Sequence, residues 1–208
     1  MDILPVLEST INSRFEPKKK EKTDNWIMSG WKENEVKFNK TKIIDEIEKL
    51  EFDLYNDLIN EKNTCPRPIY FDKKDNILTL IGLTESAKRD TAEVSTSITH
   101  NSLGTSATTA TESQTDLVAE VSGGTPTYAR KAFSTDGQRK VINQTAKYGM
   151  LWDDTDIDVT PAVDIKESGL HWDVSAASKM HARVTFTTFT FDVGDLFVIQ
   201  MNELQANA

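Results

Sequence analysis

The chain has 208 residues, a formal charge of -9 and a hydrophobic fraction of 38%. This length and hydrophobic content suffice for one medium domain with an extension, or for two small domains, with a packed core. The negative charge argues against nucleic-acid binding as the main role, because phosphates are met by clustered Lys and Arg. The sole cysteine, Cys65, excludes an intramolecular disulfide and a CxxC pair for zinc or redox chemistry.

No segment of the sequence has the features of a membrane span or a secretion signal. The N-terminus "MDILPVLESTINSRF" lacks a basic start followed by an apolar run. No apolar stretch approaches the roughly 20 residues that a membrane helix needs. We therefore expect a protein that folds in a reducing cytoplasm and does not bind membranes.

Residues 1–40 are predicted to form an extended N-terminal arm, because they are polar, charged and poor in periodic apolar positions. Trp26 and Trp31 interrupt this polar segment. Large aromatic side chains in such an arm either anchor it to another protein or fold back on the same chain. The sequence favours neither reading. In the first, both tryptophans belong to an assembly interface.

Residues 41–64 are predicted to form one amphipathic helix, whose apolar positions recur at steps of three and four residues. The other face of this helix is Asp, Glu and Lys. The apolar stripe either packs on the protein's own β-domain, the commoner outcome, or on a neighbouring subunit, which would make it an assembly interface. The stripe consists of Ile43, Ile47, Leu50, Leu54 and Leu58.

Residues 65–208 are predicted to form an antiparallel β-sandwich, so the fold class is mainly β. Pro66 and Pro68 end the helix, and short alternating runs separated by Gly-containing turns follow. The alternation slips between Phe186 and Phe189, which predicts a bulge or bend there. The predicted β-core is Tyr148, Met150, Trp152, Leu170, Trp172, Val184, Phe186, Phe197 and Ile199.

The stretch "IKESGLHWDV" at residues 165–174 brings a lysine, a glutamate and a histidine close together. As a strand it would send alternate side chains to opposite faces. Leu170, Trp172 and Val174 are then expected on the core face. The solvent face is expected to carry Glu167, His171 and Asp173.

"WDDTDIDV" places Asp154, Asp156 and Asp158 at alternate positions, as at the start of a calcium loop. The pattern then fails, because Val159 and Ile165 occupy the positions of the required Gly and Glu. A weak calcium site on a strand is conceivable. The favoured interpretation is a solvated acidic edge that discourages edge pairing.

No catalytic, metal or cofactor motif is present. His100, His171 and His181 do not have the spacing of metal ligands, although the last two could meet across neighbouring strands. GxSxG, GxxxxGK[ST] and GxGxxG are all absent. We therefore expect no catalytic residue, no metal, no cofactor and a protein that is not an enzyme.

Five segments, in this order, resemble a β-rich domain of virion proteins from tailed bacterial and archaeal viruses, found in tail-fibre, tail-collar and related accessory proteins. They are "LIGLTESAKRD", "ITHNSLGTSATTATESQTDLVAEV", "YARK", "IKESGLH" and "ARVTFTTFTFDVGDLFVIQMN". Together they span about residues 77–204. The chain departs from the family pattern at Ser106, where a second Gly is usual, and at His171, which follows "GL".

The resemblance implies a non-enzymatic structural protein of the virion, made in the host cytoplasm, whose N-terminal arm and helix join it to other virion proteins. A homo-oligomer, either a ring or a trimer, is expected. The tail, neck or collar, or baseplate is the expected location, and a capsid decoration or head-fibre protein is the alternative. Within the β-domain, Glu167 is expected to pair with Arg130 or Arg183.

A carbohydrate-binding or adhesin module is the alternative from another class. It would use Tyr148, Trp152 and Trp172 as stacking platforms, provided that their rings are exposed.

Overall fold

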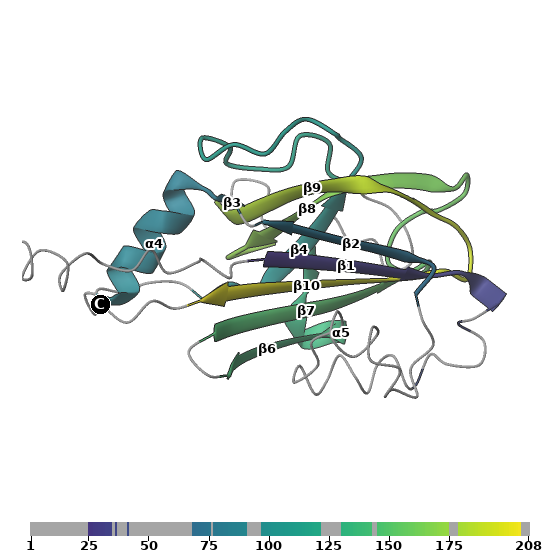
Figure 1. Cartoon of the computed structure of the whole chain (residues 1–208), viewed down its shortest axis with the longest axis horizontal. Helices are drawn as coiled ribbons and strands as arrows, with labels where there is room; N and C mark the ends of the chain where they lie inside the picture. The colour runs from purple at the N-terminus through teal and green to yellow at the C-terminus, as the bar shows by residue number, and fades with distance from the viewer. Residues whose placement is uncertain are drawn as a thin grey trace, which may run out of the picture.

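The structure is a computed structural model of the chain. It describes residues 25–34, 36, 41, 68–75, 77–90, 97–121, 130–142, 145–174 and 179–204. Two five-stranded antiparallel sheets pack face to face, as Figure 1 shows, which confirms the predicted β-sandwich. Sheet A has the order β2 (Tyr70–Asp75), β1 (Asn25–Trp31), β10 (Leu196–Leu204), β7 (Thr145–Asp153) and β6 (Gly137–Ile142). Sheet B has the order β3 (Ile77–Leu78), β9 (Met180–Phe191), β8 (Val163–His171), β4 (His100–Gly104) and β5 (Arg130–Ala132).

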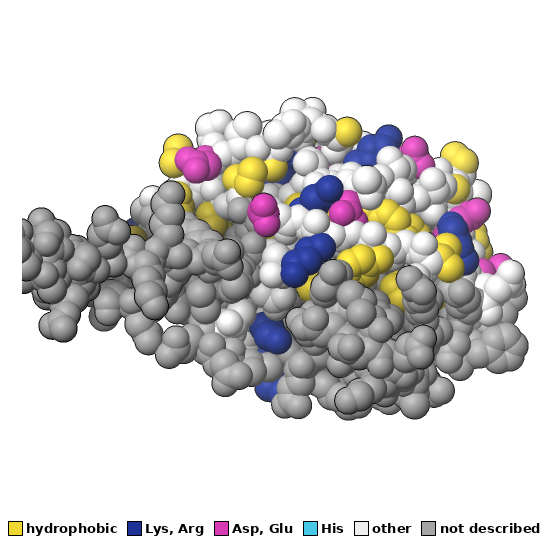
Figure 2. Space-filling model, viewed as in Figure 1, with side chains coloured by type: hydrophobic (Ala, Val, Ile, Leu, Met, Phe, Trp, Pro, Cys, Tyr) yellow, Lys and Arg dark blue, Asp and Glu magenta, His cyan; other side chains and the backbone are white. Residues whose placement is uncertain are grey.

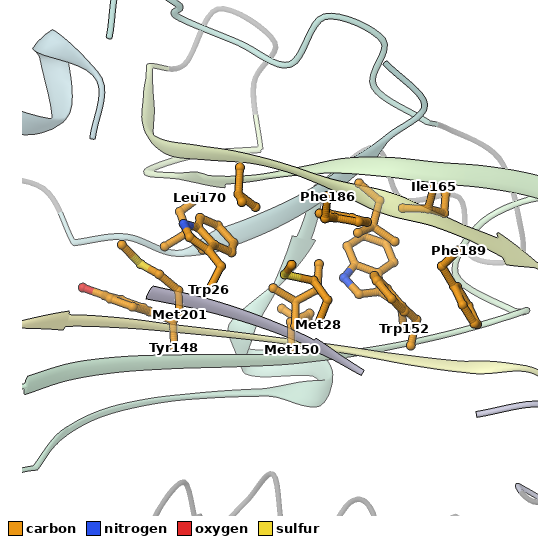
Figure 3. Packing of buried hydrophobic residues seen from close by; sticks show 14 of the residues in the cluster. Trp26, Met28, Tyr148, Met150, Trp152, Ile165, Leu170, Phe186, Phe189 and Met201 are labelled. Atoms are coloured by element: carbon orange, nitrogen blue, oxygen red, sulfur yellow. The ribbon is translucent and has the colours of Figure 1, made fainter. Parts of the chain in front are cut away.

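The hydrophobic core lies between the two sheets and is built largely from aromatic and methionine side chains (Figure 3). Phe189 and Phe197 stack across it with ring centroids 4.8 Å apart. Eight of the predicted core residues are buried in this cluster, and Trp172 is partly buried against it. The confirmed residues are Tyr148, Met150, Trp152, Leu170, Val184, Phe186, Phe197 and Ile199.

The predicted irregularity in β9 is present. The register of β9 with β8 shifts between the pairs Ile165↔Phe189 and Glu167↔Thr185, so β9 carries extra residues at this point. Because of the bulge, Phe186 and Phe189 are both buried although three residues separate them.

Residues 25–31 are not an arm, and this part of the prediction is wrong. They form β1, which is hydrogen-bonded to β10 on one side and to β2 on the other. Trp26 and Trp31 are fully buried, so neither is available as an anchor on another protein. The sandwich therefore includes residues on both sides of the predicted boundary at residue 65. The predicted helix stripe of residues 43–58 lies outside the described residues.

A helix, α4 (Leu80–Asp90), interrupts the β-domain where the sequence predicted strands and turns. Thr79 begins it, since its Oγ1 accepts a hydrogen bond from Gly82 N at 2.9 Å. The helix lies directly against β9, because a Cβ on Gly82 would stand 2.2 Å from the carbonyl oxygen of His181.

Replacing Gly82 with alanine is expected to destabilise the protein by about 1–3 kcal/mol, although alanine is the better helix former by about 1 kcal/mol. The clash is with backbone, so it can be relieved only by moving α4 or β9. Urea unfolding gives the free energy. Thr84→Ala, at an exposed position of the same helix, is the matched control and is expected to change it by no more than about 0.5 kcal/mol. A stabilised Gly82→Ala variant would contradict the close packing.

Candidate functional site

The outer face of sheet B, which is the face turned away from the core, carries a row of polar and small side chains. The row is formed by directly opposite residues of β5, β4, β8 and β9. Residues 105–121 lie over this face, as the teal loop in Figure 1 shows. The row is Arg130, Ser102, Gly169 and Arg183.

Glu167 and Arg183 form a fully buried ion pair beneath this loop. Arg183 Nη2 lies 2.7 Å from Glu167 Oε2, and both side chains have no exposed surface. This confirms one of the two predicted partners of Glu167. Contrary to the prediction, Glu167 is not on a solvent face, because the loop covers it.

The pair is also the attachment point of the loop. The carboxylate of Glu167 accepts hydrogen bonds from the backbone N–H groups of Ser106 and Ala119, at 3.3 and 2.8 Å. Arg183 donates to the carbonyl oxygen of Thr108 at 2.8 Å and to Gln114 Oε1 at 2.7 Å. Both charges are thus satisfied by the loop, which compensates for their removal from water.

Arg130, at the other end of the row, holds the second half of the loop. Its Nη2 lies 2.7 Å from Asp116 Oδ1, and its Nε lies 3.0 Å from Glu120 Oε1. Burial raises the pKa of Glu120, and the hydrogen bond and charge of Arg130 oppose that shift. Arg130 itself is buried, so its guanidinium group pairs with carboxylates of the same protein.

Two glycines make room for this network. A Cβ on Gly104 would stand 2.5 Å from Glu167 Oε1 and 2.7 Å from the carbonyl oxygen of Ala119. A Cβ on Gly169 would stand 3.1 Å from Leu117 Cδ2, which belongs to the loop. The absence of side chains at these positions lets the loop approach the sheet.

Four of the five segments that carry the resemblance therefore meet at one place, and the remaining segment, "LIGLTESAKRD", forms α4. "LGT" supplies Gly104, "YARK" supplies Arg130, "KESGL" supplies Glu167 and Gly169, and "ARVTF" supplies Arg183. They are far apart in the sequence and adjacent on sheet B. The shared geometry explains the residue types, because three charged side chains and two glycines hold one loop.

His171 is fully buried beside this row and is not half-exposed as predicted. Its Nε2 lies 2.7 Å from Ser102 Oγ. Burial, together with the positive charge of Arg130, lowers the pKa of His171 well below its usual value. The folded protein therefore holds this histidine in its neutral form at neutral pH.

Because His171 is buried in its neutral form, we expect the free energy of unfolding to depend on pH. Below about pH 6.5 the unfolded chain protonates this histidine while the folded chain does not, so the free energy of unfolding falls as the pH falls. One such group contributes at most about 1.4 kcal/mol per pH unit. His171→Gln is expected to reduce the slope between about pH 5 and pH 6.5, measured by urea unfolding at each pH. An unchanged slope would contradict the neutral, buried state.

Comparison with this variant isolates His171 from the other titrating groups. Burial also lowers the pKa of His100, which gives a contribution of the same sign. Burial raises the pKa of Glu120 and of Asp156, which gives contributions of the opposite sign. These remain in both proteins, so the difference in slope reports His171.

The prediction of a solvated acidic edge at residues 154–158 is wrong for Asp156, whereas Asp158 is exposed. The carboxylate of Asp156 is buried and lies 2.6 Å from Lys131 Nζ, which is also 2.8 Å from Asp136. Burial raises the pKa of Asp156, and the nearby Lys131 opposes the shift. Asp154 Oδ2 accepts a hydrogen bond from Gly194 N at 2.8 Å, so it fixes a neighbouring turn.

The remaining predicted site residues are not brought together. His171 and His181 do not meet: His181 Nε2 lies 3.1 Å from Glu203 Oε2, and His171 contacts Ser102. Within the described part of the chain, no group of three or more His, Cys, Asp or Glu side chains could hold a metal ion. Val174, expected in the core, is 59% exposed because β8 ends at His171.

Asn101 is a structural residue that the sequence reasoning did not find. It is buried between the sheets, where its Oδ1 accepts a hydrogen bond from Trp152 Nε1 at 2.8 Å. Its Nδ2 donates to Ser168 Oγ and to the carbonyl oxygen of Gly169, both at 2.9 Å. The link joins β7 of sheet A to β4 and β8 of sheet B. No local pattern marks it, because its partners are distant in sequence.

Comparisons with models of protein families, with curated proteins and with solved structures found no match to the chain. Among the helices of the described ranges, none is both long and apolar enough to cross a membrane.

Proposed function

We propose that the protein is a non-enzymatic structural protein of a tailed virus particle. The observation that carries the proposal is the meeting of four of the five resembling segments at one buried network. Glu167, Arg183, Arg130 and the two glycines act together to fix the 105–121 loop on sheet B. A framework role accounts for the charged side chains and glycines that these segments supply.

The charged groups of the network form ion pairs and hydrogen bonds within the protein, which favours a structural role over a reaction site. Glu167 is occupied by Arg183 and by loop N–H groups, and Arg130 by two carboxylates. A general base or nucleophile must instead reach a substrate. The same reasoning applies to Asp156, which is occupied by Lys131.

In this proposal the protein belongs to the tail, the neck or collar, or the baseplate, and its partners are other virion proteins and further copies of itself in a ring or trimer. A capsid decoration or head-fibre protein is the alternative. Because Trp26 and Trp31 are buried in β1, the assembly surface lies elsewhere in the chain. The N-terminal residues 1–24 are the first segment to test for this role.

Antibody labelling of virus particles tests the proposal. Antibodies against the purified full-length chain are applied to particles released by cells that carry its gene, and gold label is located by electron microscopy. Label on the tail, neck or baseplate supports the proposal, and label on the capsid surface supports the alternative. Antibody preabsorbed with the purified chain is the control. Particles without label, from cells whose lysate contains the chain, would contradict a virion role.

A carbohydrate-binding module receives no support from the rings named for it. Tyr148 and Trp152 are buried in the core, and Trp172 is partly buried against it and forms a T-shaped contact with His181, with ring centroids 5.6 Å apart. Their faces are not arranged as an open stacking platform.

A further inference from the structure

On the outer face of sheet A, which is turned away from the core, the three central strands carry apolar side chains that are shielded from solvent. These side chains come from β1, β7 and β10, where Trp31 is opposite Leu196 and Leu151 is opposite Val198. None of them belongs to the core cluster between the sheets. Each is at most 4% exposed. We define this patch as the sheet A outer patch: Ile27, Trp31, Leu151, Leu196 and Val198.

The described elements do not account for this shielding. On sheet B the outer face is covered by the 105–121 loop, through the network described above. Helix α4 packs on β3 and β9, and α5 (Phe133–Asp136) packs beside β5, β6 and β7. Neither helix lies over β1 and β10 in Figure 1. A further layer is therefore required over the sheet A outer patch.

We propose that this layer is the segment 41–64 of the same chain, docked through its stripe of Ile43, Ile47, Leu50, Leu54 and Leu58. The proposal goes beyond the proposed function and does not depend on it. It decides between the two partners that the sequence leaves open for the stripe, the protein's own β-domain and a neighbouring subunit.

Connectivity keeps the segment close to sheet A. It lies in the connection between β1, which ends at Trp31, and β2, which begins at Tyr70. These strands are neighbours, with Gly30 opposite Tyr70, and Ile69 N donates a hydrogen bond to the carbonyl oxygen of Gly30 at 3.0 Å. The chain therefore leaves and re-enters sheet A at the same corner, beside Trp31 of the patch.

The dimensions of the stripe and the patch agree. As a helix, the stripe from Ile43 to Leu58 is about 22 Å long, at about 1.5 Å per residue. Strand β1 has 7 residues, which at about 3.3 Å per residue gives about 23 Å. One helix can therefore cover the apolar length of the sheet without leaving either surface in water.

The charges of the two surfaces are complementary. Segment 41–64 has seven acidic and three basic residues, so its net charge is 3 − 7 = −4. The same outer face of sheet A carries Lys73, Lys140 and Lys147 together with Asp75 and Asp153, so its net charge is 3 − 2 = +1. Figure 2 shows Lys and Arg side chains spaced down this face of the molecule. Acidic side chains beside the stripe would meet this basic border.

Thiol labelling of the full-length chain tests the proposal. In a Cys65→Ser background, Val198→Cys places a single thiol in the patch, and its reaction rate with dithionitrobenzoate is measured under native conditions. Leu54→Lys disrupts the stripe, and the rate is expected to rise at least about tenfold, because a charged side chain opposes docking on an apolar face. A Val184→Cys probe inside the core reports general unfolding and is expected to keep its rate.

Asn56→Lys is the matched control. It adds the same side chain two residues away, on the opposite side of the helix. In the Asn56→Lys variant, the Val198→Cys thiol is expected to react at a rate within about twofold of the parent rate. The reason is that, in the proposed docking, the helix side opposite the stripe faces solvent. If Leu54→Lys also exposes the Val184→Cys thiol, the milder pair Leu54→Ala and Leu58→Ala replaces it, with the same selective exposure expected.

Three results would overturn the proposal. In the first, Val198→Cys in the parent reacts as fast as in urea, which would show an open patch that another protein covers. In the second, neither the lysine variant nor the alanine pair changes the rate. In the third, protection is lost on dilution while light scattering shows a falling mass, which would make a second copy the cover. Protection independent of concentration is the expected result.

Discussion

Replacing Arg183 with methionine is expected to lower the free energy of unfolding by about 3–5 kcal/mol, the usual cost of removing one partner of a buried ion pair. The variant leaves the carboxylate of Glu167 buried without its counter-charge. It also removes the hydrogen bonds from Arg183 to Thr108 and Gln114 of the loop. Urea unfolding monitored by tryptophan fluorescence measures the loss.

Lys166→Met is the matched control for this prediction. Lys166 lies 3.5 Å from Asp164 at a solvent-exposed pair on β8. Exposed pairs contribute about 0–1 kcal/mol, so the control is expected to change stability by no more than that. If Arg183→Met costs no more than Lys166→Met, the pair does not hold the loop, and the framework role of the network is wrong.

Replacing Trp26 with alanine is also expected to cost about 3–5 kcal/mol, because it leaves a large cavity in a packed core. Trp26 is fully buried in β1 and belongs to the cluster between the sheets (Figure 3). An anchor on another protein would behave differently: its removal would weaken assembly and leave the monomer's stability unchanged. Thermal and urea unfolding of the isolated chain therefore separate the two roles.

Val141→Ala provides the comparison for Trp26→Ala. Val141 lies on the edge strand β6 and is 71% exposed. Its truncation is expected to change stability by no more than about 0.5 kcal/mol. A Trp26→Ala variant as stable as Val141→Ala would place residues 25–31 outside the sandwich and restore the predicted arm.

The alternation of core-facing residues along the sequence predicted those strands that pair with their neighbours in a regular register. Strands β7 and β10 follow this rule, and their inward residues, Tyr148, Met150, Phe197 and Ile199, were predicted from spacing. The bulge in β9 was also predictable, because Phe186 and Phe189 could reach the same core only if the strand gained residues between them.

β1 was not predictable from alternation because both of its faces are covered. Met28 faces the core while Ile27 and Trp31 belong to the outer patch, so apolar and polar residues do not alternate along the strand. It is also short and follows a lysine-rich segment, which favoured the reading as an arm. Only its pairing with β10, about 170 residues away in the sequence, makes it a strand.

The loop that covers the outer face of sheet B explains why residues predicted to face solvent in the candidate site are buried. The solvent face predicted for β8 is buried by the 105–121 loop, so Glu167 and His171 are interior residues. Nothing in "KESGLH" shows that a loop some 50 residues earlier lies over it. Lys131 and Asp156 were missed because their 2.6 Å contact depends on tertiary packing.

Amide hydrogen exchange of Ser106, Val118 and Ala119 tests most directly whether the network holds the loop. The backbone N–H groups of all three donate to Glu167, at 3.3, 3.3 and 2.8 Å. In Glu167→Ala these amides are expected to exchange on the order of a hundredfold faster than in the parent protein, because hydrogen bonds to a charged acceptor are lost. The amide of Ile199, in β10, is expected to keep its protection. Unchanged exchange at the three loop amides would contradict the account.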